Sequence, residues 1–146
     1  MATTITNATL TVTLAESVTL NGKAYGNSNT LTIADINEVD GRIMTIPTSE
    51  VNILAYDTAV GAGTFVGANV KYMRITNKDN ANYVKLKIAD GGSDHYWVKL
   101  EAGKSFMLHN NLVETADPFS AFANIDTISA IADTAAVDIE YFIALS

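Results

Sequence analysis

Residues 83–109 read "YVKLKIADGGSDHYWVKLEAGKSFMLH" and contain three segments of alternating apolar and polar residues, separated by two short links. In the first segment Val84, Leu86 and Ile88 face one way, which is the period-two pattern of a strand with one buried face. The links "DGGS" and "EAGK" have the length and glycine content of hairpin turns, and Gly103 suits the left-handed position in the second. The stretch therefore predicts three consecutive antiparallel strands.

The same alternation recurs along the rest of the chain. Further strand-like segments lie at residues 7–14, 18–20, 30–33, 41–47, 51–57, 70–77, 125–133 and 136–146. A helix start is indicated by Asp117 followed by Pro118, but β-type sequence soon follows it. About nine or ten short strands at spacings of roughly 8 to 15 residues are typical of an antiparallel β-sandwich. We expect an all-β, jelly-roll-like sandwich.

Length and composition indicate a single domain over residues 1–146. The chain has 146 residues, of which 48% are hydrophobic and 17% charged, so it has enough apolar side chains to bury a core. In the segment 7–14, Leu10 and Val12 lie on one face and threonines on the other, which predicts a half-buried strand. Residues 1–16 are expected to be an arm or an edge strand of this domain.

Charge and the lack of cysteine exclude several kinds of partner. The net charge of −7 and the pI near 4.6 repel phosphate, and the lysines and arginines form no continuous run, so nucleic acid is not expected. There is no cysteine for a disulfide or a thiolate metal site. No apolar run approaches the roughly 20 residues of a membrane span, and the N-terminus lacks a signal-peptide pattern. We expect no membrane partner and a protein that stays in the cytosol until it joins an assembly.

Motifs that resemble chemical sites fail on inspection. The stretch "GAGTFVG" at 61–67 has its third glycine one position too late for a dinucleotide-binding turn, so a loop is expected. The stretch "DINEVDG" at 35–41 has the acidic spacing of a calcium loop, but Asp40 stands where glycine is needed, which favours a solvated loop. His95 and His109 have no catalytic partner in a recognisable motif. We expect no catalytic centre, no metal and no cofactor.

The lone tryptophan is the most informative side chain. Alternation places Tyr96, Val98 and Leu100 toward the core and Trp97 and Lys99 toward the outside. Tryptophan is enriched in the anchors of protein interfaces, so an outward Trp97 favours a subunit contact. The outward residues predicted to form an interface are Trp97, Lys99, Phe142 and Tyr83.

Two other interpretations of Trp97 stay open at this point. A slip of one residue in the register would place the ring in the core. Alternatively, Trp97 with Tyr96 or Tyr83, beside Asp94, forms a platform on which a sugar stacks. The second alternative predicts a carbohydrate-binding module whose ligand is a host glycan.

Three blocks of the chain, at 18–54, 70–108 and 132–144, resemble the small β-sandwich virion proteins of tailed bacteriophages, especially those of marine and cyanobacterial hosts. The resemblance covers residues 17–145 and lies in short phrases such as "RITN", a polar loop, "VKL" and "EAGKSF". It implies a capsid cement or decoration protein that binds the major capsid protein or other virion proteins and joins neighbouring capsomers as a homo-oligomer. It also implies assembly into the virion in the host cytoplasm. A tail, fibre or adaptor component is the alternative within this class.

Overall fold

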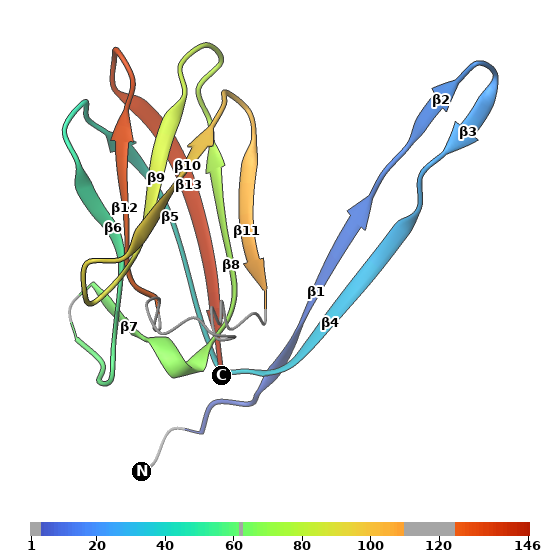
Figure 1. The fold of residues 1–146 in the computed structure, drawn as a ribbon. Helices are drawn as coiled ribbons and strands as arrows, with labels where there is room; N and C mark the ends of the chain where they lie inside the picture. The colour runs from blue at the N-terminus through green and yellow to red at the C-terminus, as the bar shows by residue number, and fades with distance from the viewer. Residues whose placement is uncertain (1–3, 62, 110–124) are drawn as a thin grey trace.

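The computed structural model describes residues 4–61, 63–109 and 125–146, and within them nearly all regular structure is β-strand. Two sheets face each other in the body of the molecule (Figure 1). The first sheet has the order β11-β8-β13-β5, with β5 (Glu38–Ile46), β8 (Val70–Asn77), β11 (Ser105–His109) and β13 (Val137–Leu145). The second has the order β10-β9-β12-β6-β7, with β6 (Val51–Asp57), β7 (Thr64–Val66), β9 (Val84–Asp90), β10 (His95–Leu100) and β12 (Ile125–Ala132).

The order of the strands defines a jelly roll. The chain passes from β5 in the first sheet to β6 in the second, returns to β8, crosses to β9 and β10, and returns again to β11. β12 and β13 then insert into the middle of the second and first sheets respectively. The resulting sheets, β5-β13-β8-β11 and β6-β12-β9-β10, have the two-Greek-key arrangement of a double-sheet jelly roll, with β7 added in parallel beside β6. The predicted all-β, jelly-roll-like sandwich is confirmed.

Alternate side chains of both sheets form the core. β13 shows the pattern most clearly, because Ile139 and Ile143 are fully buried while Asp138 between the inward positions is exposed. Across the core, Leu86 and Ile88 of β9 are also fully buried. Each such side chain stabilises the fold by about 1.5–3 kcal/mol through removal of apolar surface from water. Packing of the two inner faces therefore holds this cysteine-free domain together.

Asn77 joins the two sheets at one end of the core. Its side chain is fully buried at the end of β8. Its Nδ2 donates to the carbonyl oxygens of Asn82, at 2.9 Å, and of Leu100 in the other sheet, at 3.0 Å. Its Oδ1 accepts from the Asp79 backbone N–H at 2.9 Å. One amide thus satisfies three backbone groups and fixes the β8–β9 link.

The first part of the chain leaves the sandwich as a long hairpin, which we call the arm (residues 8–36; Figure 1). Its strands are β1 (Ala8–Ala15), β2 (Val18–Leu20), β3 (Lys23–Tyr25) and β4 (Ser28–Ile36), with β1 paired to β4 and β2 to β3. At the tip, Asn21 and Gly22 have φ of 50° and 76°. Two consecutive residues with positive φ are the signature of the type I′ turn that suits a two-residue hairpin.

The structure corrects three predictions within residues 8–67. Strand 8–14 has the predicted alternation, but it is not half-buried in the sandwich, because it pairs only with β4 in the arm and most of its residues are exposed. The segment 61–67 is not simply a loop, since Thr64–Val66 forms β7 before the short 3₁₀ helix η1 (Gly67–Asn69). The segment 35–41 is not a solvated loop either, because it ends β4 and begins β5. The predicted cap at Asp117 and Pro118 lies outside the described residues.

The stretch 83–109 forms the three predicted strands, β9, β10 and β11, and β9 and β10 are the predicted antiparallel hairpin. The prediction of a hairpin at "EAGK" is wrong, because β10 and β11 belong to different sheets and this link crosses between them. Gly103 has a φ of 71°, which is the left-handed conformation expected in the β10–β11 link. In β10, Leu100 is buried while Tyr96 and Val98 pack partly buried against the core. Alternation therefore predicted the correct register for this part of the chain.

Candidate interaction surfaces

The outer side of the second sheet carries what we call the tryptophan face: Tyr83, Lys85, Lys87, His95, Trp97 and Lys99. Trp97 is 44% exposed and points away from the core, so the interpretation of this residue as a core tryptophan is wrong. Trp97 lies opposite Lys87 in the β10–β9 register. The structure brings three of the four predicted interface residues, Trp97, Lys99 and Tyr83, onto this one face.

Cations surround the exposed ring. The Nζ atoms of Lys85 and Lys87 lie 5.8 and 5.7 Å from the centre of the Trp97 ring, and the His95 ring meets it edge-on at 6.2 Å. These distances are within the range of cation–π attraction, which at exposed sites amounts to about 0.5–1 kcal/mol. The ring therefore has cationic and aromatic neighbours and is still 44% exposed.

Lys99 and Tyr83 form a second contact on the same face. The Lys99 Nζ lies 4.2 Å from the centre of the Tyr83 ring and 2.6 Å from Glu101 Oε1. The hydrogen bond to Glu101 raises the pKa of Lys99, and a hydrogen bond to Asp133 raises the pKa of Tyr83. Both groups thus keep their protons at neutral pH, and the face presents a mixture of aromatic and cationic groups.

The fourth predicted interface residue, Phe142, lies elsewhere. It projects from β13 on the outer side of the first sheet, as alternation predicts. Its ring centre is 6.0 Å from that of Tyr72, and it packs with Tyr72 and Ala144 against the base of the arm. Phe142 is therefore half-buried within the molecule and does not belong to the tryptophan face.

The arm has one apolar and one polar face. Pairing across β1 and β4 places Leu10 opposite Ile33 and Val12 opposite Leu31, with Leu14 next on the same side. The other side carries threonines, with Thr11 opposite Thr32 and Thr13 opposite Thr30. No second layer of the described chain covers the apolar face beyond its base. A two-stranded hairpin alone is marginally stable in water.

Only the base of the arm is packed. Leu10, Val12 and Ile33 contact the small cluster formed by Ile36, Tyr72 and Ala144. Further out, the apolar side chains are solvent-exposed, with Val18 at 56% and Leu20 at 61%. The apolar surface thus begins at the packed base of the arm on the sandwich and extends along the arm to residues that are exposed to solvent.

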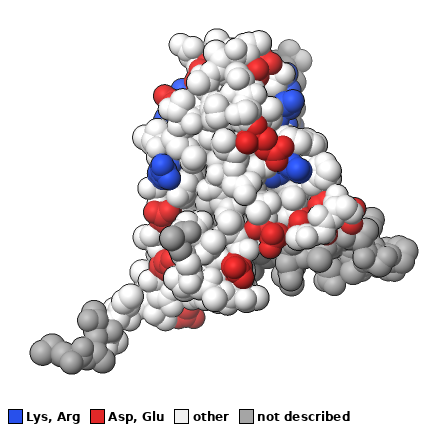
Figure 2. Space-filling view, turned by 90° about the vertical axis from the view of Figure 1, so that its left-hand side faces the viewer, with Lys and Arg blue, Asp and Glu red and all other residues white. Residues whose placement is uncertain are grey.

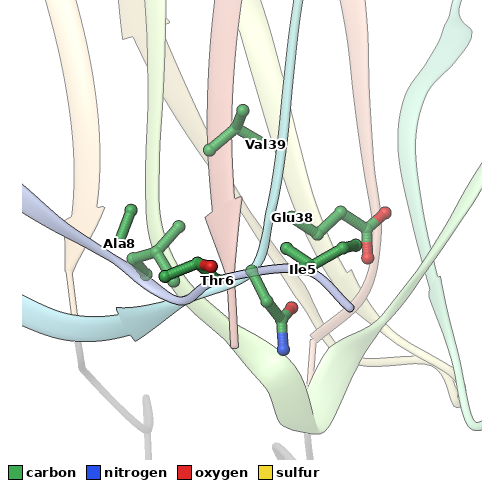
Figure 3. A pocket seen from close by; sticks show the side chains of 7 residues that line it. Ile5, Thr6, Ala8, Glu38 and Val39 are labelled. Atoms are coloured by element: carbon green, nitrogen blue, oxygen red, sulfur yellow. The ribbon is translucent and has the colours of Figure 1, made fainter. Parts of the chain in front are cut away.

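A shallow pocket lies where the arm meets β5 (Figure 3). Its volume is about 220 Å³, and it is lined by Ile5, Thr6, Ala8, Ile36, Asn37, Glu38 and Val39. Pockets that bind small molecules are usually about 300–1,000 Å³ with several converging polar groups. Glu38 is the one titratable residue among those that line the pocket, and its carboxylate points away from Thr6 and Ala8 in Figure 3. The pocket is therefore a gap at the junction of the arm and β5, and its volume and lining do not fit a ligand site.

Beside this junction, the edge of the first sheet exposes apolar side chains. In the β13–β5 register Val39 lies opposite Ala144 and Ile43 opposite Glu140, so both belong to the outer side of the sheet. Val39 is 59% exposed and Ile43 is 64% exposed. β5 ends the sheet in the described part of the chain. Exposed β-branched residues on an end strand are a common site of pairing or packing with another chain.

An ion pair crosses the same outer surface. Arg74 Nη2 lies 2.6 Å from Glu140 Oε1, and the Arg74 guanidinium also donates to Thr76. The hydrogen bond and the positive charge of Arg74 hold the pKa of Glu140 below its ordinary value of 4.5. The pair is partly exposed, so its effect on stability is modest.

This pair makes the stability of the fold depend on pH. Because the folded-state pKa of Glu140 is lowered, its stabilising effect is present above pH 4.5 and is lost as pH falls through the folded-state value. We expect Glu140→Gln to reduce the free energy of unfolding at pH 7, and the difference from wild type to be smaller at an acidic pH well below 4.5. Urea unfolding at both pH values measures this. An equal difference at the two pH values would contradict the ionic origin of the effect.

Charge elsewhere is dispersed. Figure 2 shows acidic and basic side chains scattered singly or in small groups over a largely uncharged face. In residues 4–61, 63–109 and 125–146, no three His, Cys, Asp or Glu side chains lie together in a way that could hold a metal ion. No helix in these same ranges is long and apolar enough to cross a membrane. The described surface is thus marked by three features: the tryptophan face, the arm, and the apolar edge of β5.

Comparisons with known proteins give no match: no protein family, no curated protein and no solved structure is significantly similar to the chain. The class to which the chain belongs is therefore a structural one, an all-β jelly roll with a projecting amphipathic arm.

Proposed function

We propose that the chain is a non-enzymatic structural subunit of a phage virion, a decoration or cement protein that binds the outside of the head and bridges capsomers. The observation that supports this proposal is the arm, whose apolar face extends into solvent from a well-packed domain. A lone chain gains nothing from such a surface, because exposed leucine and valine cost free energy until another protein covers them. The sequence resemblance to phage β-sandwich proteins supplies the virion context.

The jelly roll agrees with this proposal without requiring it. The same architecture occurs in viral capsid proteins, in lectins and in cupins, so the fold alone does not distinguish assembly from ligand binding. Head, tail and fibre components share the need for an exposed assembly element, and a tail or adaptor role is the alternative location in the virion. The head assignment rests on the cement-protein resemblance.

Reconstitution on particles tests the proposed function directly. Purified chain is added to heads that lack it, and sedimentation of the heads separates bound from free protein. We expect saturable binding with a stoichiometry set by the capsid lattice, and heads that withstand more heat or chelator than bare heads. Binding to isolated tails but not to heads would move the protein to the alternative location.

One observation favours a second candidate function, a carbohydrate-binding module. Trp97 offers an exposed ring, and stacking on a flat aromatic ring is a common mode of sugar binding. Tyr96 does not share this platform because it packs against the core, but Tyr83 lies on the same face. Retention of the chain on a column of host polysaccharide would support this function, and retention on heads alone would not.

Trp97→Ala separates folding from binding. We expect the free energy of unfolding to change by less than about 1 kcal/mol, because the ring is outside the core. Binding to the partner should weaken by about 2 kcal/mol, roughly thirtyfold in Kd, if the ring anchors an interface. Chemical denaturation and binding to heads are measured on the same preparation.

The neighbouring residue provides the control. Tyr96→Ala changes an aromatic side chain of the same strand that packs against the core, so its stability should fall by about 2 kcal/mol or more. If the two variants behave alike in stability, the outward assignment of Trp97 is wrong. If Trp97→Ala binds heads normally and loses glycan binding, the tryptophan face belongs to the second candidate function.

A further inference from the structure

We propose that the arm is exchanged between two copies of this chain, so that the outer apolar half of one arm packs on the β5 edge of the first sheet in the other copy. This inference rests on the proposed assembly function and names the partner of the arm. The contact surface is Leu14, Leu31, Val18 and Leu20 on the arm and Val39 and Ile43 on the sheet.

The first argument is that each chain presents both halves of a complementary pair. At its base, the apolar face of the arm already packs on the outer side of the first sheet, through Leu10, Val12 and Ile33 against Tyr72 and Ala144. The same arm face continues outward uncovered, and the same sheet side continues to Val39 and Ile43 uncovered. A second copy covers the exposed part of the arm and the exposed part of the sheet at once, through the same kind of apolar contact as at the base of the arm.

The second argument is charge. The arm carries only Glu16, Lys23 and Asp35, a net charge of −1, so most of the net charge of −7 belongs to the rest of the chain. Two copies that met through their sandwiches alone would bring like charges together, which costs free energy at low ionic strength. An arm with so few charges lets two acidic chains associate with less repulsion than a contact between their sandwiches. An acidic or basic macromolecule would gain little electrostatic attraction from this arm.

The third argument is area. Strands rise about 3.3 Å per residue and lie about 4.8 Å apart, so the outer half of one arm face offers on the order of 200–300 Å². Counting the sheet surface that it covers, and repeating the contact by twofold symmetry, gives on the order of 800–1,200 Å² in total. Protein interfaces of about this size are those of weak complexes. Reciprocal exchange therefore gives the area of a weak dimer, whereas a single arm contact gives only half of it.

The base of the arm has the geometry to aim it. Asp35 in β4 has a φ of 62°, a left-handed conformation that is uncommon outside glycine, and the β1–β4 register shifts between Ala8 and Leu10. A bulge of this kind bends a strand and so changes the direction of the hairpin. On the sandwich side of the bulge, the Asn37 backbone N–H donates to the Leu145 carbonyl at 3.0 Å, which ties the start of β5 to β13. The arm therefore starts from a fixed position on the sandwich, and the bulge sets the direction in which it projects.

Because the chain contains no cysteine, cross-linking tests this arrangement without background. Leu14→Cys is mixed with an affinity-tagged chain carrying Val39→Cys or Ile43→Cys, and the mixture is oxidised mildly. Disulfides require Cα atoms within about 7 Å, so we expect at least about tenfold more mixed dimer with one of these pairs than with a matched control. The control is Thr13→Cys, which lies on the opposite face of the same strand.

Light scattering on the wild-type chain at about 50 µM, well above a micromolar Kd, gives the second readout, and a dimer mass is expected. A monomer at that concentration overturns the exchange, as does a dominant cross-link between two Leu14→Cys chains, which would place arm against arm. A monomer that binds heads would overturn the exchange and leave the proposed function standing. A dimer that shows the expected cross-link but does not bind heads would support the exchange and contradict the proposed function.

Discussion

Asn77→Leu should lower the free energy of unfolding by about 3 kcal/mol or more, the largest loss we expect from one polar substitution in this chain. Leucine has similar volume but cannot donate to the carbonyl oxygens of Asn82 and Leu100 or accept from the Asp79 N–H. A buried backbone group without its hydrogen bond costs about 1–3 kcal/mol, and the site is fully buried. Urea denaturation followed by tryptophan fluorescence measures the loss.

A neighbouring asparagine serves as the control for this substitution. Asn80 lies in the same link but is exposed, so Asn80→Leu should change the free energy of unfolding by less than about 0.5 kcal/mol. A loss under about 1 kcal/mol for Asn77→Leu would mean that Asn77 does not join the two sheets in the way described.

The double variant Leu14→Asp with Leu31→Asp should abolish association while the sandwich stays folded. Both side chains lie on the apolar face of the arm and outside the core. Burying a carboxylate against apolar surface is strongly unfavourable, so two such changes should raise the Kd for any partner of this face by at least about 100-fold. Light scattering and head sedimentation report association, and thermal denaturation reports the fold.

The opposite face of the arm offers a geometrically matched control. Thr13→Asp with Thr32→Asp places the same two charges on the same two strands, in the same diagonal relation. We expect this variant to associate at least about tenfold more tightly than the leucine variant, because the threonine face stays in water. Equal loss in both variants would attribute the effect to charge on the arm or to arm unfolding, not to its apolar face.

Alternation in the sequence predicted the sandwich well because its signal is strongest where one face is buried. Strands 51–57, 70–77 and 105–109 have the predicted bounds, and the register of Trp97 is correct. The same signal misled at 8–14, since alternation shows that a strand is amphipathic and does not show what covers its apolar face. The apolar face of the arm has the same sequence pattern whether its partner is inside the chain or outside it.

The candidate surfaces could be predicted only in part. Trp97, Lys99 and Tyr83 share a face because neighbouring strands place alternate residues side by side. Phe142 was correctly placed outward, but its sheet could not be known, because sheet membership depends on long-range pairing of β13 with β5 and β8. The exposed Ile43 was missed for the same reason.

Hydrogen exchange along the arm tests most sharply whether another protein chain covers this hairpin. Backbone amides of β1 and β4 are compared in dilute monomer and in chain bound to heads. An isolated hairpin opens readily, whereas a covered one opens only when its partner leaves, so we predict at least about tenfold slower exchange in the arm on assembly. Exchange in core strands such as β13 should change little. Assembly with no added protection of residues 8–36 would contradict the proposed role of the arm.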